Sequence, residues 1–382
     1  MRPTIPRISI ARRGAVALTI LVALGSAACT GPGRGLGPLP SPSGARTPPG
    51  AQALRTCFVA PPRRWVELLD RHPVTLPPGL SFAPGAVEGG VAYGQFRSPH
   101  GEGIASLDLI SGRLTPIAPY PPGASGLGWM VAATPWLVWE EGDSTADLGS
   151  WSLHAWDQRT GQQMLLARSE GGEGPRGQPP LPALRGTAAA WAQPVGGAGP
   201  LPHAQVHLFD LARGRDTVLA TGTVSSPVFA GPYLIWARLD GRGATALQAV
   251  EASSLRPVTL PNNLAHPGPV GYLAGSQRYL AWSSGDLARL TVWEIGDNRL
   301  TTYTSDLRHP FQFLQLAGHF VLWFGGTTFS VLDLRSGAAF DVPGAVAGSE
   351  ETIVTSDPAP GASVRVSAIP IAELGSSPGC GG

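Results

Sequence analysis

Four acidic residues in one short stretch are the first candidates for chemistry in this sequence. Glu140, Glu141, Asp143 and Asp147 lie close together, and carboxylates at such spacing can surround a hard cation such as Ca²⁺. The stretch lacks the ligand spacing of an EF-hand loop, however. We therefore interpret it as the solvated, acidic tip of a hairpin, and we predict neither a metal site nor a cofactor.

Two histidines form a second candidate site. His154 and His207 each stand three positions before an acidic residue, Asp157 or Asp210, at the end of an apolar segment. Imidazoles at equivalent positions of adjacent strands can act together only if the strands bring them close. We expect neighbouring strands to hold the two rings too far apart to share a metal ion, and we interpret both histidines as ordinary polar packing.

No residue is predicted to be catalytic. The nearest match to the Gly-x-Ser-x-Gly motif of serine hydrolases, Gly123–Gly126, has the wrong spacing, and no helical segments suggest the α/β domain that such enzymes need. All 27 basic residues are arginine, which excludes a Schiff-base lysine and a P-loop lysine. The formal net charge of +1 shows no bias toward nucleic acid, and we predict no nucleic-acid partner.

A repeated pattern of strands accounts for most of the remaining sequence. Its best-marked part is a short apolar segment that ends in an aromatic residue, and six copies end at Tyr93, Trp139, Trp191, Trp236, Trp282 and Trp323. A weaker seventh copy ends at Thr355. A further segment follows each copy, and the first six of these end in an acidic residue: Asp108, Asp157, Asp210, Glu251, Glu294 and Asp333. The best copies then have a glycine, as a tight hairpin turn with positive φ requires.

The repeat predicts the fold. A step of about 45 residues with four strands per unit is typical of β-propellers. We therefore predict an all-β fold, a single seven-bladed β-propeller of four-stranded antiparallel blades. The seventh unit lacks a fourth strand, and Pro73–Pro77 matches the fourth strand of the fourth unit, Pro257–Pro261. An N-terminal strand is thus expected to complete the last blade and leave no open sheet edge, after a short helix over 64–70.

The repeat resembles the TolB-like and WD-repeat-like propellers of bacterial envelope proteins. The resemblance rests on the aromatic-ended strand and on the acidic residue followed by a Thr/Ser-Gly turn, as in Trp156–Gly161. It covers about residues 73–374, although most copies lack the Trp-Asp dipeptide of true WD repeats. The resemblance implies a propeller of the cell envelope and says little about activity, because propellers host many unrelated functions.

The N-terminal residues have the features of a targeting segment. Arginines at positions 2, 7, 12 and 13 precede an apolar stretch, 14–24, that is too short to span a bilayer. The sequence Gly-Ser-Ala-Ala-Cys at 25–29 resembles a bacterial lipobox. We predict a signal peptide at 1–28, lipid on Cys29, a Gly/Pro/Ser-rich tether at 29–55 and a propeller domain at 56–380. Secretion after cleavage at Ala28 and an uncleaved anchor are the alternatives.

Two cysteines remain if Cys29 carries lipid. They are Cys57 and Cys380, and an oxidising compartment outside the cytoplasm favours a disulfide between them. Both are expected beside the seam of the ring, where a bond would hold the two ends of the domain together. Two unpaired thiols near the ends of the domain are the alternative.

The functional prediction is a binding or scaffold module. We expect a lipid-anchored monomer outside the cytoplasmic membrane that touches the membrane only through its lipid and binds a protein or glycan of the cell envelope. The alternative is an extracellular propeller enzyme acting on glycans, a hydrolase or a lyase. A cluster of three or more ionisable groups at the mouth of the channel would reverse the preference for binding. The loops after the second strands offer candidate ligand contacts: Arg97, Glu140, Glu141, Asp143, Arg238, Arg242 and Asp286.

The tryptophans divide into two groups. Most of the 11 tryptophans fall at fixed positions of the repeat, and we interpret these as core residues between blades. Trp129, Trp136 and Trp151 lie off the aromatic-ended position. They are the better candidates for exposed ligand contacts.

Overall fold

Strands make up most of the described residues. The computed structural model describes residues 52–120, 126–142, 150–169, 179–195, 203–239, 245–264, 267–305, 308–357 and 363–375, all within one unit, Pro42–Gly382. In these residues there is one α-helix, α1 (Arg63–Arg71), and two 3₁₀ turns, η1 (Asn262–Leu264) and η2 (Ile371–Glu373). No helix in the described part of the chain is long and apolar enough to cross a bilayer.

The described strands form groups of four, which we number blades 1 to 7 along the chain. Blade 1 comprises β4 (Ser81–Glu88), β5 (Val91–Ser98), β6 (Gly101–Asp108) and β7 (Leu114–Pro119). Blade 2 comprises β8 (Gly126–Ala133), β9 (Trp136–Gly142), β10 (Trp151–Asp157) and β11 (Gln162–Arg168). Blade 3 comprises β12 (Ala183–Arg185), β13 (Ala188–Pro194), β14 (Ala204–Asp210) and β15 (Arg215–Val224). Blade 4 comprises β16 (Val228–Ala230), β17 (Tyr233–Leu239), β18 (Thr245–Glu251) and β19 (Pro257–Val258). Blade 5 comprises β20 (Val270–Gly275), β21 (Tyr279–Ser284), β22 (Arg289–Glu294) and β23 (Arg299–Thr304). Blade 6 comprises β24 (Gln312–Ala317), β25 (Phe320–Phe324), β26 (Phe329–Asp333) and β27 (Ala338–Val342). Blade 7 comprises β28 (Ala345–Gly348), β29 (Thr352–Asp357), β30 (Arg365–Pro370) and β3 (Val74–Thr75).

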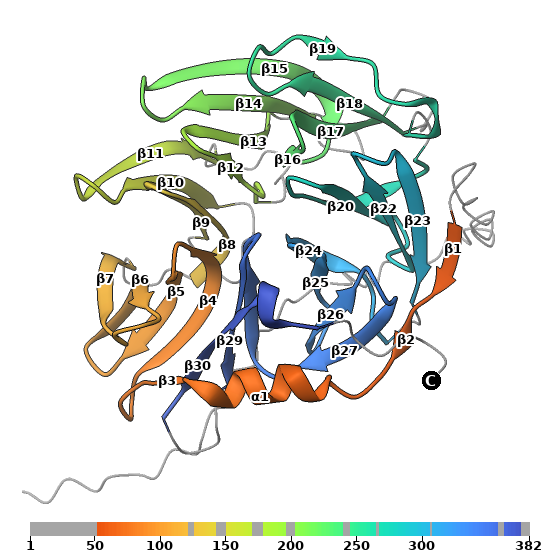
Figure 1. Ribbon diagram of the computed structural model, residues 1–382. Coiled ribbons are helices and arrows are strands. Elements are labelled where there is room, and N and C mark those ends of the chain that lie inside the picture. Colours follow the sequence, from red (N-terminus) through yellow and green to blue (C-terminus); the bar gives the residue numbers. More distant parts are fainter. Residues whose placement is uncertain are drawn as a thin grey trace, which may run out of the picture. The chain divides into compact units, whose positions relative to one another are not determined.

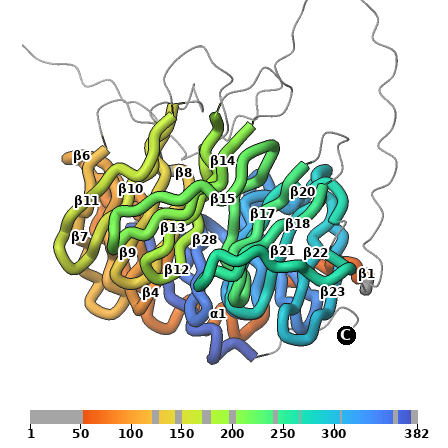
Figure 2. Tube along the Cα trace, turned by 90° about the horizontal axis from the view of Figure 1, so that it is seen from above, coloured from red at the N-terminus to blue at the C-terminus, as the bar shows by residue number. Residues whose placement is uncertain are grey.

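The blades are arranged around an axis. Strands within each blade are antiparallel, and blades 3 and 4 share one sheet because the end of β15 pairs with β17. The first strands contact one another in cyclic order, from β4 to β8 and onward to β28, which contacts β4 again (Figure 1). Seen from above, the strands of blades 3, 4 and 5 follow one another along the ring (Figure 2). The predicted all-β propeller of four-stranded antiparallel blades is confirmed.

The hydrophobic core lies between the blades. Each apolar cluster joins two neighbouring blades, and the clusters run around the ring from blades 1 and 2 to blades 7 and 1. The repeated aromatic lies inside the second strand, which continues beyond it, and is buried in every copy from Tyr93 to Trp323. Large aromatic side chains therefore occupy the interfaces between blades, as the sequence pattern predicts.

The acidic residue at the end of the third strand organises the next turn. Asp108, Asp157, Asp210 and Asp333 each accept a hydrogen bond from a backbone N–H two residues further on. Glycines with positive φ follow in these four turns, a conformation that costs glycine little. The repeated acidic residue and glycine thus have a structural role in hairpin turns.

A segment that we call the N-terminal belt, residues 52–75, follows the outer edges of blades 5, 6 and 7. Within it, β1 (Gln52–Arg55) adds in parallel to β23, and β2 (Cys57–Phe58) adds in parallel to β27. Helix α1 then packs against blades 6 and 7, and β3 pairs with β30. The short helix and the N-terminal strand that completes the last blade are confirmed. Since β1 falls among the residues predicted to be tether, the folded body starts no later than Gln52.

Several sequence predictions concern residues outside the described ranges. The signal peptide at 1–28 and the lipidation of Cys29 lie there, as do Asp143, Arg242 and Cys380. Cys57 is described and begins β2. Its pairing with Cys380 stays a prediction.

Candidate functional site

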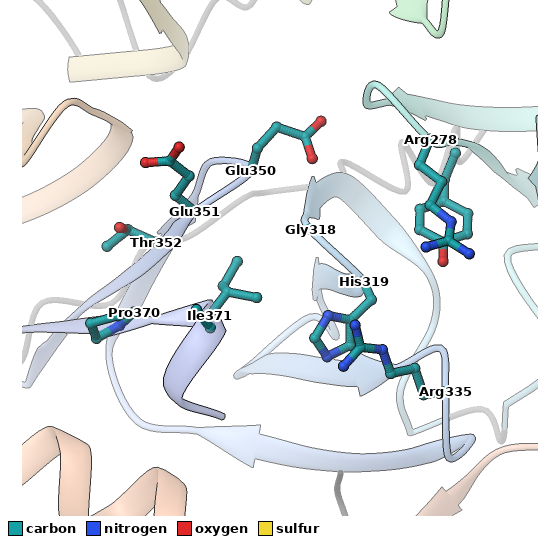
Figure 3. A pocket seen from close by; sticks show the side chains of 11 residues that line it. Arg278, Gly318, His319, Arg335, Glu350, Glu351, Thr352, Pro370 and Ile371 are labelled. Carbon is teal, nitrogen blue, oxygen red and sulfur yellow. The ribbon is translucent and has the colours of Figure 1, made fainter. Parts of the chain in front are cut away.

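A pocket with a volume of about 590 Å³ lies beside the turns that join the first and second strands of blades 5, 6 and 7. Because the first strands line the axis, these turns surround one mouth of the ring, and we call the cavity the mouth pocket. Its lining includes arginine, histidine and glutamate side chains, shown in Figure 3: Arg278, His319, Arg335, Glu350 and Glu351. Within the described residues, no three His, Cys, Asp or Glu side chains are grouped as a metal site requires.

Blade 5 supplies a guanidinium that is fixed by an ion pair. The Nε atom of Arg278 donates to Glu294 at 2.8 Å, and Arg299 binds the other oxygen of the same carboxylate. Burial alone would raise the pKa of Glu294, but the hydrogen bonds and charges of the two arginines outweigh it and lower that pKa. The arginine side chains remain mostly exposed while the carboxylate is buried, so this group presents positive charge to the pocket.

Blade 6 supplies a nearly buried imidazole and a second arginine. The His319 ring packs against Phe320, with 4.1 Å between ring centres, and its Nε2 atom has no hydrogen-bond partner. Burial, followed by the positive charge of Arg335, lowers the pKa of His319. Asp333 lies 3.9 Å away and opposes this effect without cancelling it. The imidazole is therefore neutral near pH 7.

Blade 7 supplies the acidic side of the mouth pocket. Glu350 accepts a hydrogen bond of 2.7 Å from the backbone N–H of Gln277, which links the turns of blades 7 and 5. Glu351 follows it in the same turn, and its charge helps burial to raise the pKa of Glu88 in blade 1. The mouth thus has arginines on one side and glutamates on the other (Figure 3).

The centre of the ring is crossed by side chains of β24. Phe313 stacks on Trp129 of blade 2, with 6.4 Å between ring centres, and lies 4.9 Å from the ring of Tyr272 in blade 5. The amide of Gln315 donates to Gly85 of blade 1 and accepts from Gly348 of blade 7. Side chains of β24 thus contact blades 1, 2, 5 and 7 around the centre of the ring.

The ligand contacts predicted from the sequence lie at the other end of the blades. Arg97 in β5 pairs with Glu102 at 2.7 Å, Arg238 lies in β17, and Asp286 accepts hydrogen bonds from Ser284 and Ala288 within its own turn. These residues belong to hairpins of three different blades. Their role in ligand binding stays a prediction.

The interpretation of Glu140 and Glu141 as a solvated hairpin tip is wrong. Both residues lie inside β9 and are buried. The carboxyl of Glu140 sits against Gly128 and accepts a hydrogen bond from the backbone N–H of Trp129. Burial is the main reason that the pKa of Glu140 rises to about 7, with Glu141 adding to it.

The off-repeat tryptophans and the two histidines are mostly packing residues. Trp136 and Trp151 are buried, which contradicts their predicted exposure, whereas Trp129 is partly exposed beside the axis. His154 and His207 each stack on the tryptophan of their own blade, with ring centres 5.4 and 5.2 Å apart. Their interpretation as polar packing is confirmed.

Sequence reasoning missed the residues of the mouth pocket. Arg278, His319 and Glu350 stand in turns of three different blades, and nothing in the repeat marks them. One signal was available: the turn between first and second strands holds charged residues in blades 5 and 7 but Gly231–Pro232 in blade 4. Comparison of equivalent turns would have drawn attention to these positions.

Comparison with known proteins identifies the fold. No family profile and no curated protein matches the chain. An oligogalacturonate lyase in complex with manganese is 11% identical over 78% of this chain and 92% of its own, with a TM-score of 0.50. An oligogalacturonate lyase from Vibrio parahaemolyticus is 10% identical over 80% of this chain and 93% of its own, with a TM-score of 0.49. TolB from Acinetobacter baumannii is 9% identical over 77% of this chain and 66% of its own, with a TM-score of 0.39.

The similarity to the lyase with a TM-score of 0.50 supports the β-propeller fold alone. A shared fold does not transfer an activity. The function must therefore be argued from the mouth pocket.

Proposed function

We propose that this chain is an extracytoplasmic, lipid-anchored binding module that holds a protein or a glycan of the cell envelope in the mouth pocket. The observation that carries the proposal is a cavity of about 590 Å³ with arginine and glutamate side chains at one mouth of the ring. A concave site with a few fixed polar groups is the usual form of a ligand site. The N-terminal apolar stretch and the lipobox-like 25–29 support the location.

Several charged groups of the pocket are held by the fold before any ligand arrives. Arg278 is fixed on Glu294, and Glu350 is fixed on the Gln277 backbone. A site whose polar groups are positioned in advance loses less entropy when it binds a ligand. This pre-organisation favours recognition of a ligand over general acid–base catalysis, which needs a proton-transfer group free to reach the reacting atoms.

The second candidate function is an enzyme acting on acidic glycans. It is favoured by the ionisable groups at the axial mouth and by His319, which is neutral, lacks a partner at Nε2 and lies beside Arg335. A neutral imidazole next to a cation that holds a substrate carboxylate is an arrangement suited to proton abstraction. In this structure the Nε2 atom is buried, so turnover would require Arg335 or the ligand to expose it.

Affinity capture from an envelope extract tests the proposal, with the full-length protein in detergent as bait. The informative variant is Arg335→Glu, which reverses a pocket charge. Arg159→Glu is the matched control, because Arg159 holds the same turn position in blade 2 and is not a lining residue. We expect the wild type and R159E to recover one stoichiometric partner and R335E to lose it.

The same samples distinguish the two candidate functions. Retention of the partner by R335E would show that the binding site lies outside the mouth pocket. Depolymerisation of uronic-acid or sulfated glycans by the wild type, abolished in His319→Ala and kept in His154→Ala, would replace the binding proposal with the enzymatic one.

A further inference from the structure

We infer that the mouth pocket recognises a zwitterionic peptide segment, whose anionic group faces Arg278 and Arg335 and whose cationic group faces Glu350 and Glu351. This inference rests on the proposed binding function and narrows its ligand to one chemical class. It follows from the separation of opposite charges across one cavity (Figure 3).

The side formed by blades 5 and 6 carries the guanidinium groups of the pocket. Arg278 and Arg299 share one carboxylate, that of Glu294. Arg335 adds a further guanidinium, and the nearby Asp333 has no exposed surface. His319 contributes no charge near neutral pH because burial and Arg335 lower its pKa. An anionic group in the pocket therefore meets the exposed guanidinium groups of Arg278 and Arg335.

The side formed by blade 7 has an excess of negative charge. Glu350 and Glu351 are adjacent in one turn and both line the cavity. The hydrogen bond from Gln277 satisfies one oxygen of Glu350 without neutralising its charge. Arg185 of blade 3 interacts electrostatically with Glu350, and its guanidinium donates to the backbone oxygen of Gly231 and stacks over Phe229.

The two sides do not neutralise each other within the protein. In the described residues, no ion pair joins Arg278 or Arg335 to Glu350 or Glu351, although all four side chains line one cavity. Separated opposite charges in a partly enclosed site are best satisfied by a ligand that carries the complementary pair. A purely anionic ligand would be repelled by the glutamates, and a purely cationic ligand would be repelled by the arginines.

The chemistry of the two expected ligand classes decides between them. Peptides carry carboxylate and ammonium or guanidinium groups a few residues apart. Neutral glycans carry neither group, and uronic-acid or sulfated glycans without free amino groups carry only the anionic one. A second copy of this chain supplies both signs too, but its cations are arginines alone, because the sequence contains no lysine.

Alanine peptides with free or blocked ends test the inference, since they vary charge while side-chain chemistry stays constant. The probes are di-, tri- and tetra-alanine with both ends free, with an acetylated N-terminus, and with an amidated C-terminus. Binding to the full-length protein in detergent is measured by isothermal titration calorimetry. We expect one of the free peptides to bind at least tenfold more tightly than either blocked form of the same length.

Charge-reversal variants locate the two ends of the ligand. Arg335→Glu should remove the preference for a free carboxylate, and Glu351→Arg should remove the preference for a free amine, while R159E leaves both preferences unchanged. Equal binding of free and blocked peptides, or binding of none of them, would overturn the inference. The proposed function would still stand in either case if R335E alone lost the captured envelope partner.

Discussion

Glu140 shows how the fold alters the pKa of a single carboxyl group. Its carboxyl lies beneath the bulge of β8, against Gly128 and near Glu141, and is largely removed from water. Charged carboxylates are disfavoured in such surroundings, which is why the pKa of Glu140 rises to about 7. The folded protein therefore holds this proton more tightly than the unfolded chain does.

Stability should depend on the ionisation of Glu140. Because the folded pKa is raised, its favourable contribution is complete below the ordinary glutamate range and is lost as the pH rises toward 7. Glu140→Gln should be as stable as the wild type near pH 4.5 and more stable at pH 8, by up to about 3 kcal/mol. Urea unfolding at several pH values measures the difference. A gap that does not vary with pH, or the same gap in the exposed control Glu67→Gln, would contradict this.

Gly128 is the second residue-scale test. A Cβ atom at this position would lie 1.3 Å from the Glu140 carboxylate, whereas a Cβ at Gly296 would meet nothing within 4 Å. Gly128→Ala should therefore cost about 2 kcal/mol through overpacking, and Gly296→Ala should lower stability by much less. Thermal unfolding compares the two, and equal midpoints would show that Glu140 can move aside.

At the scale of elements, α1 depends on its packing. The helix has only nine residues, too few to be stable in isolation. Its Trp65 ring makes edge contacts with Phe340 and Phe320, at 4.9 and 6.3 Å between ring centres. The helix therefore holds the belt against blades 6 and 7.

Removal of this anchor should be costly. Trp65→Ala is expected to destabilise the protein by about 3–5 kcal/mol, as for other buried tryptophans. The neighbouring Val66 is 45% exposed, so Val66→Ala should change stability by less than about 0.5 kcal/mol. Denaturant unfolding of both variants checks the contrast, and a similar small loss in both would show that α1 is peripheral.

The elements also show what a sequence pattern can and cannot predict. β3 was predictable because Pro73–Pro77 repeats the residues of another fourth strand. β1 and β2 were not, since their parallel partners, β23 and β27, lie far along the chain. Glu140 was misplaced because charged residues usually mark loops, whereas here a glycine in the neighbouring strand makes room for the carboxyl. The pocket residues come together only through ring closure.

For the whole molecule, the belt joins the beginning of the described chain to its end. It adds strands to blades 5 and 6, packs a helix under blades 6 and 7, and completes blade 7. At blade 7, β3 covers part of the outer edge of β30. The belt is therefore part of the folding unit.

Truncation distinguishes the belt from the tether. A chain that starts at Gln52 should unfold at the same urea midpoint as the full-length protein. A chain that starts at Pro77 lacks the belt and should unfold at a much lower midpoint, or aggregate through the exposed edge of β30. Equal midpoints for the two shortened chains would show that the seven strand groups close without β3.

The parallel pairing of β1 has a consequence for the order of assembly. Gln52 leaves the ribosome long before its partner Thr301 is synthesised. β1 can therefore pair only after the fourth strand of blade 5 has been made. Contacts of such large sequence separation slow folding. The belt therefore cannot take its final place on blade 5 until about four fifths of the chain has been made, so the last step of folding joins the two halves of the sequence.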